Sequence, residues 1–242
     1  MEPVRALVIG MGEVGQALKL ILSEKYEVHC RDVEEVEIPQ GISVMHVALN
    51  YVALGHDKWL EITQGYIEKY RPRLIDICST VRPGTTRLLG PNASHSTTRG
   101  LHPHLAEGLR SIPKHIGGQR AGELASYYSN AGIKCIVHKK PETTEVAHIA
   151  HLLDYGIQLI SADMRQKLCR ETNVDYLEAV TKYTETHNSG FLSLDMPSKV
   201  RMNLTPPNGR VGGHCVIQAA QLARLAGFAH PLVDMLARYN DR

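Results

Sequence analysis

The sequence predicts an α/β protein in which a mostly parallel sheet, covered by helices on both faces, is followed by an all-helical domain. Apolar, β-branched runs alternate with helix-like segments as far as residue 140, and apolar residues recur at helical spacing from Pro141 onward. We therefore expect two domains, residues 1–140 and residues 141–242, each long enough to bury a core.

The N-terminal segment "VRALVIGMGEVGQALKLILSEKYEVHCRDV" is the most informative stretch. Val4–Ile9 is a predicted buried strand, Gly10, Gly12 and Gly15 form a GxGxxG turn, and a helix and a second strand follow. The first glycine permits a tight turn, the second lets the backbone approach a pyrophosphate, and the third lets the helix pack on the strand. This context predicts a Rossmann-type dinucleotide-binding domain.

An acidic residue, Asp32, ends the second predicted strand. A carboxylate there accepts hydrogen bonds from a ribose 2′-hydroxyl and repels a 2′-phosphate, which favours NAD over NADP, although the neighbouring Arg31 could pair with that phosphate. The predicted cofactor-binding residues are Gly10, Met11, Gly12, Glu13, Val14, Gly15, Asp32, Asn50, Ser79 and Thr80.

The alternation continues beyond this unit. Predicted strands cover residues 42–49, 73–80, 114–119 and 132–138, and predicted helices cover residues 56–70 and 121–132. Ligands of such sheets bind beyond the carboxyl ends of the strands. We therefore expect Asn50, Ser79, Thr80 and the loop His102–Gly108 to lie near the cofactor and the substrate.

The second half reads as helical. Predicted helices cover residues 142–173, with Thr143 or Thr144 as the N-cap, and residues 174–188 and 216–227, while residues 193–213 form a loop rich in Pro, Gly and Asn. A long amphipathic helix after a dinucleotide-binding domain also predicts a homodimer through the helical domain.

Composition argues against several functional classes. A net charge of +2, 5% aromatic residues and the lack of an apolar run near the ~20 residues of a membrane span give no case for nucleic-acid or membrane partners. The N-terminus runs directly into a strand, so we expect no cleaved signal. The five scattered cysteines favour a reducing cytoplasm, and four of them are expected to pack in the core: Cys30, Cys78, Cys135 and Cys169.

The order of the motifs resembles the UDP-glucose/GDP-mannose dehydrogenase family. After the glycine turn come "STVRPGTT", the "HPHLAEG" loop with "IGG", the helix opening "TEVAHIA" and finally "GRVGGHC". The resemblance runs over nearly the whole chain. It implies a nicotinamide cofactor that oxidises a sugar alcohol in two steps, with Cys215 as nucleophile, Thr80 positioning water or substrate, and Glu107 in the acid/base loop.

Several positions depart from that family. His148 and Leu152 stand where the family helix carries Lys and Asn, Gln218 and Ala219 replace a Lys-Asp pair, and His104 replaces the Glu of a Pro-Glu pair. The family also has a C-terminal domain, and we expect this chain, which ends at Arg242, to be a shortened relative. His148 can replace Lys as a cation or general base, whereas Leu152 cannot replace Asn.

The histidines allow a second interpretation, a metal site. His148 and His151 lie at i, i+3 on the predicted helix, and Cys215 or His214 could add a third ligand. No spacing matches a zinc motif, so we expect no metal and instead a polar pocket for a small-molecule substrate. The predicted catalytic residues are Cys215, His148, Thr80, Glu107 and His104, and the predicted substrate-binding residues are His102, His151, Arg210, Gly212, Gly213 and His214.

Three functions therefore stay open. The first is an NAD-dependent dehydrogenase that acts on a sugar-like or small alcohol or aldehyde, with Cys215 as a possible nucleophile. The second is a β-hydroxyacid-dehydrogenase-like enzyme, with a helical domain like that of 6-phosphogluconate dehydrogenase, that uses His148 as acid/base and leaves Cys215 idle. The third is a non-catalytic dinucleotide-binding protein, in which Cys215 packs as a small buried residue.

Overall fold

The computed structural model describes residues 4–33, 36–100, 103–212 and 214–241. The chain divides into two compact units, residues 1–148 and 149–242, and the long helix α6 begins in the first and continues into the second. In the part of the chain that the structure describes, no helix combines the length and the apolar character that crossing a membrane requires.

The first unit is built on one seven-stranded sheet with the order β2-β1-β3-β4-β5-β6-β7. Strands β1 to β5 are parallel, whereas β6 is antiparallel to β5 and β7 is parallel to β6. The predicted mostly parallel sheet is confirmed. The strands are β1 (Arg5–Ile9), β2 (Glu27–Arg31), β3 (Val44–Val47), β4 (Leu74–Ile77), β5 (Ala93–Ser96), β6 (Lys114–Gly117) and β7 (Cys135–His138).

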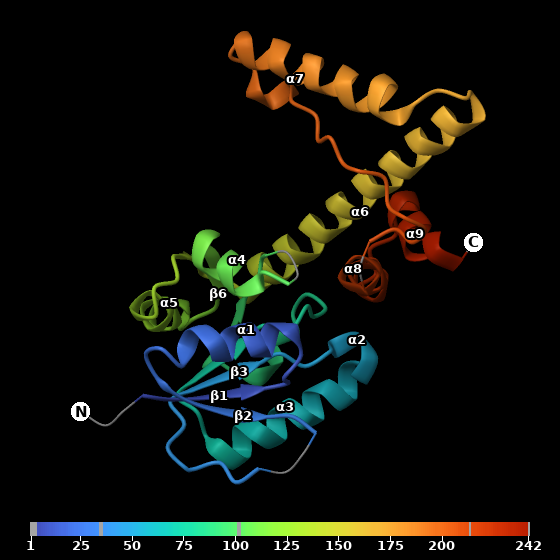
Figure 1. The fold of residues 1–242 in the computed structure, drawn as a ribbon. Coiled ribbons are helices and arrows are strands. Elements are labelled where there is room, and N and C mark those ends of the chain that lie inside the picture. The colour runs from blue at the N-terminus through green and yellow to red at the C-terminus, as the bar shows by residue number, and fades with distance from the viewer. Residues whose placement is uncertain (1–3, 34–35, 101–102, 213, 242) are drawn as a thin grey trace. The chain divides into compact units, whose positions relative to one another are not determined.

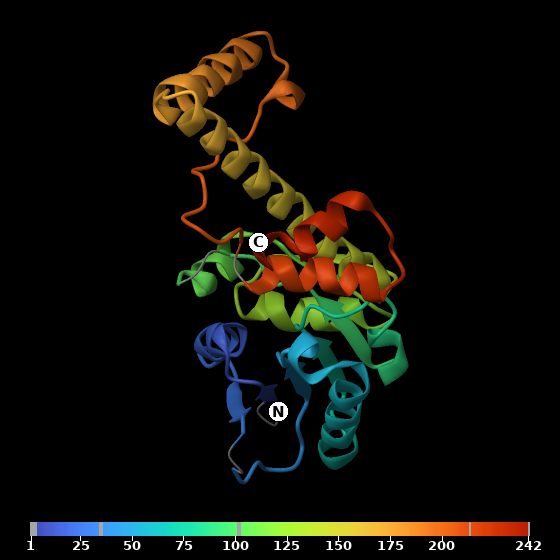
Figure 2. The ribbon, with the colours of Figure 1, turned by 90° about the vertical axis from the view of Figure 1, so that its right-hand side faces the viewer.

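Helices cover both faces of this sheet. Figures 1 and 2 show α1 and α3 on opposite sides of the strands. The core on the α1 face also includes side chains of α4 and α5, such as Leu105 and Leu124. The helices are α1 (Glu13–Leu22), α2 (Tyr51–Leu54), α3 (His56–Tyr70), α4 (Leu105–Ser111) and α5 (Ala121–Asn130), and η1 (Thr86–Leu89) is a 3₁₀ turn.

The second unit is helical. The chain follows α6 (Pro141–Glu171), a π-helical segment η2 (Leu177–Lys182), α7 (Tyr183–Ser193), a 3₁₀ turn η3 (Pro197–Lys199), α8 (His214–Leu225), α9 (Pro231–Ala237) and a last 3₁₀ turn η4 (Tyr239–Asp241). Gly156 of α6 allows close packing, because a Cβ there would lie 2.6 Å from Val216 of α8 and 2.7 Å from Leu236 of α9.

Some elements were missed, and some local predictions were wrong. The stretch Ala93–Ser96 is a fully buried strand, although two serines and a histidine gave no apolar pattern. The predicted loop His102–Gly108 becomes helix α4 from Leu105. The N-cap prediction at Thr143 or Thr144 fails because α6 begins at Pro141, whose fixed φ suits a first helical turn. Helices α2 and α9 were also missed.

Candidate functional site

One edge of the first unit gathers most of the predicted cofactor residues. Strands β2, β1, β3 and β4 are parallel neighbours, so their carboxyl ends meet at the same edge of the sheet. The glycine turn follows β1, Asp32 follows β2, Asn50 follows β3, and Ser79 and Thr80 follow β4. A ligand that spans this edge is within reach of all of these segments.

The glycine turn has the backbone that close approach requires. Gly10 has φ +90°, and a Cβ there would lie 2.7 Å from the carbonyl oxygen of Ala48. A Cβ on Gly15 would lie 1.9 Å from the carbonyl oxygen of Gly10, so α1 packs directly on the turn. Around Gly12, no atom of the described residues comes within 4 Å of the corresponding position.

The start of α1 fits a pyrophosphate. Gly12 is the N-cap and provides no side-chain cap, so the first backbone N–H groups of the helix are available to an anion. Met11 and Val14 are half-buried around the turn, and Glu13 is exposed in the first helical turn. Three observations therefore show that the glycine segment fits a dinucleotide: the positive φ of Gly10, the close packing of α1 at Gly15 and the open space around Gly12.

Two side chains bear on the choice between cofactors. Asp32 is exposed just beyond β2, where its carboxylate faces solvent. Arg31 donates from Nε to the Tyr66 hydroxyl at 3.1 Å, which gives this guanidinium a partner within the unit. Asn50 caps α2, because its Oδ1 accepts the backbone N–H of Ala53 at 3.1 Å.

The "STVRPGTT" motif forms the loop between β4 and η1, and a buried carboxylate of α6 holds it. Glu145 accepts the backbone N–H of Gly84 at 2.6 Å and that of Thr86 at 2.9 Å. Burial raises the pKa of Glu145, and the hydrogen bonds from Thr86 and Gly84 oppose that rise. Ser79 is buried and donates to the carbonyl of Val47 at 3.2 Å, which fixes the start of the same loop.

His148 lies one turn after Thr144 and Glu145 on α6, at the end of the first unit. Its ring centroid is 6.4 Å from that of His95, a fully buried residue of β5. The hydroxyl of Thr144 and Nδ1 of His95 are 2.9 Å apart. Burial, and then the neighbouring His148, lower the pKa of His95 to about 3, so His95 is neutral near pH 7.

The first turn of α4 lies near the glycine turn but points its charged groups to solvent. A pocket of about 870 Å³ is lined by Met11 and Glu13 on one side and by Pro103, Leu105 and Ala106 on the other. His104 and Glu107 form an exposed pair, Nδ1 to Oε1 at 3.5 Å. The pKa of Glu107 is lowered by its own backbone N–H and by His104.

The "GRVGGHC" motif forms the entrance to α8 in the second unit. Gly212 has φ +71°, and a Cβ there would lie 2.8 Å from Cβ of Val216. Asn240 fixes the turn, because its side chain accepts the N–H of Val211 at 2.9 Å and donates to its carbonyl at 3.1 Å. Cys215 is half-buried in the first turn of the helix and forms no disulfide.

The other predicted substrate-binding residues are placed as follows. His151 on α6 and Arg210 before α8 are both exposed in the second unit. His102 and Gly213 lie outside the described residues, and of His214 only the position at the start of α8 is described.

A buried polar network that was not predicted from the sequence joins residues of β3, β4 and α5. Oδ2 of Asp76 accepts from Nδ1 of His46 at 2.8 Å, from the thiol of Cys78 at 3.0 Å and from the hydroxyl of Tyr128. Burial raises the pKa of Asp76, but the His46 hydrogen bond and the charge of Lys114 outweigh it and hold that pKa well below its usual range. His46, Asp76 and Cys78 each offer an atom of a type that binds metals, and these atoms lie within 4.8 Å of one another. Here they hydrogen-bond to one another, and Lys114 supplies the compensating charge.

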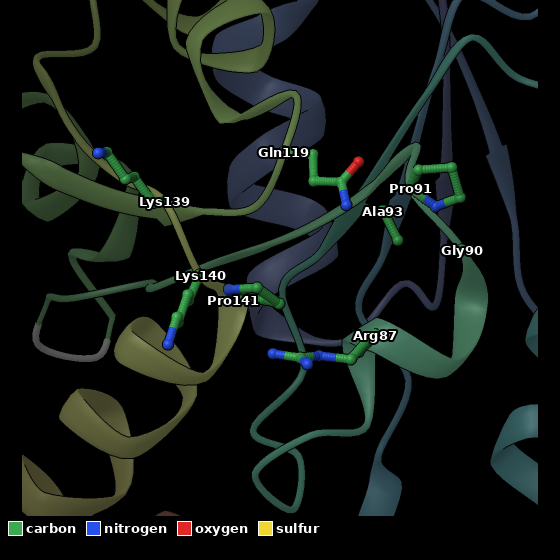
Figure 3. Close-up of a pocket in the computed structure, with 8 residues that line it drawn as sticks. All are labelled: Arg87, Gly90, Pro91, Ala93, Gln119, Lys139, Lys140 and Pro141. Atoms are coloured by element: carbon green, nitrogen blue, oxygen red, sulfur yellow. The ribbon is translucent and has the colours of Figure 1, made fainter.

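A second pocket, of about 390 Å³, lies at the opposite edge of the sheet, where β5 begins and β6 and β7 end. Figure 3 shows Lys139 and Lys140 pointing in different directions from the chain that enters α6. Arg87 in the same pocket is paired with Glu142 at 2.6 Å. These cations do not converge on one point, and the pocket is not at the cofactor edge.

No protein-family model and no curated protein matches the sequence. Solved structures do match. A UDP-D-ManNAc dehydrogenase from Pyrococcus horikoshii superposes with a TM-score of 0.77 at 20% identity, over 99% of this chain and 68% of that one. The chain has the fold of the nucleotide-sugar dehydrogenases.

Two further structures give the same fold. A UDP-glucose dehydrogenase from Pyrobaculum islandicum matches with a TM-score of 0.66 at 15% identity, over 99% of this chain and 68% of that one. A 3-hydroxyisobutyrate dehydrogenase from Mycobacterium tuberculosis matches with a TM-score of 0.67 at 12% identity, over 99% of this chain and 94% of that one. Both layouts anticipated from the sequence, the nucleotide-sugar and the β-hydroxyacid type, are therefore represented among the similar structures.

Proposed function

We propose that this protein is a dehydrogenase that binds a nicotinamide dinucleotide, with NAD favoured over NADP, and oxidises a CH–OH group of a sugar-like or small-molecule substrate. The glycine turn carries this proposal. Its open approach at Gly12 and its uncapped helix N-terminus fit a pyrophosphate, and the turn follows the first strand of the sheet. The dehydrogenase fold of the similar structures supports the same conclusion.

The residues at the carboxyl edge suit the remaining parts of NAD. Asp32 would accept hydrogen bonds from the ribose 2′-hydroxyl, and the segments at Asn50, Ser79 and Thr80 would line the rest of the cofactor. The bound cofactor supplies hydride acceptance, and the protein supplies orientation and proton transfer.

Two residues are candidates for the chemistry, and they separate two versions of the proposal. His148 follows Glu145 by one helical turn, its ring centroid lies 6.4 Å from that of the neutral His95, and its imidazole is the candidate acceptor for the proton of a substrate alcohol. Cys215 lies in the first turn of α8, and its thiol is the candidate nucleophile for attack on an aldehyde. If only His148 acts, oxidation stops at the aldehyde or ketone.

The helical unit suits a homodimer in the cytoplasm. Large apolar side chains are exposed on α6 and α7, among them Met164, Leu168 and Tyr183 at 60%, 61% and 71% exposure. None of the five cysteines, all of which the structure describes, forms a disulfide, which supports a reducing compartment. Sedimentation of the full chain checks the dimer, and an exclusively monomeric species would contradict it.

Cofactor binding tests the proposal most directly. Calorimetric titration of the full chain with NADH and with NADPH is expected to give a saturable signal for NADH at lower concentration. Reduction of NAD in the presence of a panel of nucleotide sugars, sugar alcohols and hydroxyacids then identifies the substrate class. A protein that binds neither dinucleotide is not a dehydrogenase, and one that binds NADH but reduces no NAD with any substrate is a non-catalytic binding protein.

A further inference from the structure

A ring of hydrogen bonds joins the first residues of α2 and α3 to the loop after β4. Nη2 of Arg82 lies 3.2 Å from Nε2 of His56, and Nδ1 of His56 lies 2.6 Å from the hydroxyl of Tyr51. The Tyr51 hydroxyl lies 3.4 Å from that of Thr85, which donates to the carbonyl of Arg82 at 2.6 Å. The ring therefore returns to the residue from which it starts.

Arg82 fixes the direction of every bond in this ring, because its guanidinium donates and its carbonyl accepts. A guanidinium only donates, so Nε2 of His56 is an acceptor without a proton. Nδ1 then carries the proton and donates to Tyr51, which leaves the Tyr51 hydroxyl to donate to Thr85. His56 is therefore neutral in this arrangement, and a second proton on Nε2 would face the N–H of Arg82.

The ring connects segments that the proposed function places at the cofactor. Tyr51 directly follows Asn50, which caps α2, and Arg82 and Thr85 belong to the loop that begins with Ser79 and Thr80. Glu145 holds that loop through Gly84 and Thr86 from the side of α6, and the ring holds it from the side of α2 and α3.

We propose that neutral His56 is a positioning residue for the cofactor-binding edge, and that its protonation opens the ring and lowers the affinity for the dinucleotide. The proposal rests on the proposed function, because it concerns the same edge. Among the described residues, the His56 ring contacts the guanidinium of Arg82, from the loop after β4, and the phenol of Tyr51, from α2. Asp57 follows it on its own helix. A protonated His56 would be repelled by the guanidinium of Arg82, which lies 3.2 Å from its Nε2.

The chain contains a built-in reporter of this ring. Trp59 is the single tryptophan of the sequence, is fully buried, and packs edge-on against Tyr51 with ring centroids 5.5 Å apart. Its fluorescence therefore reports a movement of Tyr51 without any cofactor present.

The test compares the full chain with three variants between about pH 8 and about pH 5, where histidines change charge. His56→Gln keeps an acceptor and a donor in one uncharged amide, and His56→Phe removes both. His115→Gln is the matched control, because it removes a histidine that is stacked on His138 of β7 rather than a member of the ring. Trp59 emission and the dissociation constant of NADH are measured for each.

In the wild type and in His115→Gln, we expect Trp59 emission to titrate and NADH affinity to fall about fivefold towards pH 5, since about one net hydrogen bond is lost. His56→Gln should bind NADH with an affinity independent of pH, and His56→Phe should bind weakly throughout. If the pH dependence of Trp59 emission is identical in the wild type and in His56→Gln, protonation of His56 does not open the ring. If Trp59 emission depends on pH but NADH affinity does not, the ring does not influence cofactor binding. Absence of NADH binding at every pH would contradict the proposed function, while Trp59 would still decide whether His56 controls the ring.

Discussion

Glu145 accepts the backbone N–H of Gly84 at 2.6 Å, so a buried carboxylate of α6 holds the loop that follows β4. The same carboxylate accepts the N–H of Thr86 at 2.9 Å. The loop carries Ser79 and Thr80 at its start, and its shape therefore depends on a residue far along the sequence.

Replacing Glu145 by Gln should change how stability depends on pH. Burial raises the pKa of Glu145 in the folded state above its value in the unfolded chain, about 4.3. The contribution of Glu145 to the free energy of unfolding is therefore complete at pH values below the unfolded pKa. It is lost as pH rises through the folded pKa. We expect the wild type to lose stability relative to Glu145→Gln between about pH 4 and about pH 7. Urea unfolding at a series of pH values measures this, and parallel curves for the two proteins would contradict it.

Gly15→Ala should impair folding, whereas Gly12→Ala should leave folding nearly unchanged. A Cβ at Gly15 would lie 1.9 Å from the carbonyl oxygen of Gly10, so Gly15→Ala should destabilise the unit by several kcal/mol or prevent folding. Around Gly12 the described residues leave this position open, so Gly12→Ala should change stability by less than about 1 kcal/mol.

Gly12→Ala should nevertheless weaken NADH binding about tenfold or more, because the new methyl group faces the expected pyrophosphate. Thermal unfolding and NADH titration of both variants separate the two effects. Unchanged NADH affinity in a folded Gly12→Ala protein would place the cofactor elsewhere.

Asp32→Ala should shift the preference from NAD towards NADP. The carboxylate repels a 2′-phosphate and binds a 2′-hydroxyl, so its removal should weaken NADH and strengthen NADPH, changing the ratio of their dissociation constants about tenfold. Arg31 is hydrogen-bonded to Tyr66 and is not expected to reverse the wild-type preference. Titrations with both dinucleotides check this, and an unaltered ratio would show that Asp32 does not contact the ribose.

Cys215→Ser distinguishes the two versions of the chemistry once a substrate is known. If the thiol forms a covalent intermediate, the variant should lose aldehyde oxidation by more than about a thousandfold, while alcohol oxidation through His148 persists. Cys169→Ser serves as the control, since Cys169 is a buried thiol of α6. Aldehyde oxidation that survives in Cys215→Ser would contradict a covalent intermediate on Cys215.

Gly156→Ala tests the packing of α8 and α9 on α6. The added methyl group would lie within 3 Å of Val216 and Leu236, and we expect a loss of about 1 to 3 kcal/mol. Gly190→Ala is the matched control, because around this exposed glycine of α7 the described structure has no atom within 4 Å. It should stabilise the helix by up to about 1 kcal/mol. Equal effects of the two variants on the urea midpoint would contradict the packing.

The sequence predicted the elements whose local pattern and tertiary environment agree. Strand β1, the glycine turn and α1 were found because an apolar run, three glycines and an amphipathic face each indicate the same structure. Strand β5 was missed because its serines and histidine are buried by neighbouring strands and by Thr144 of α6, which no local pattern shows.

The candidate site divides in the same way. The residues at the ends of β1 to β4 could be placed on one edge because parallel topology follows from alternation. Glu145, His95 and His56 could not, because each acts through a hydrogen bond to a residue distant in sequence. The one available signal was Asp76, an acidic residue in the apolar run "RLIDIC", which in hindsight requires buried partners.

Three residues of α6 repeat at every third position and each holds a different part of the first unit: Glu142 pairs with Arg87, Glu145 binds the loop after β4, and His148 meets His95. A slip of the helix by one residue would turn this row by about 100° and break all three contacts together. These three contacts together fix the register of α6 against the first unit. A one-residue insertion before Glu142 should therefore be far less harmful than one between Glu142 and His148.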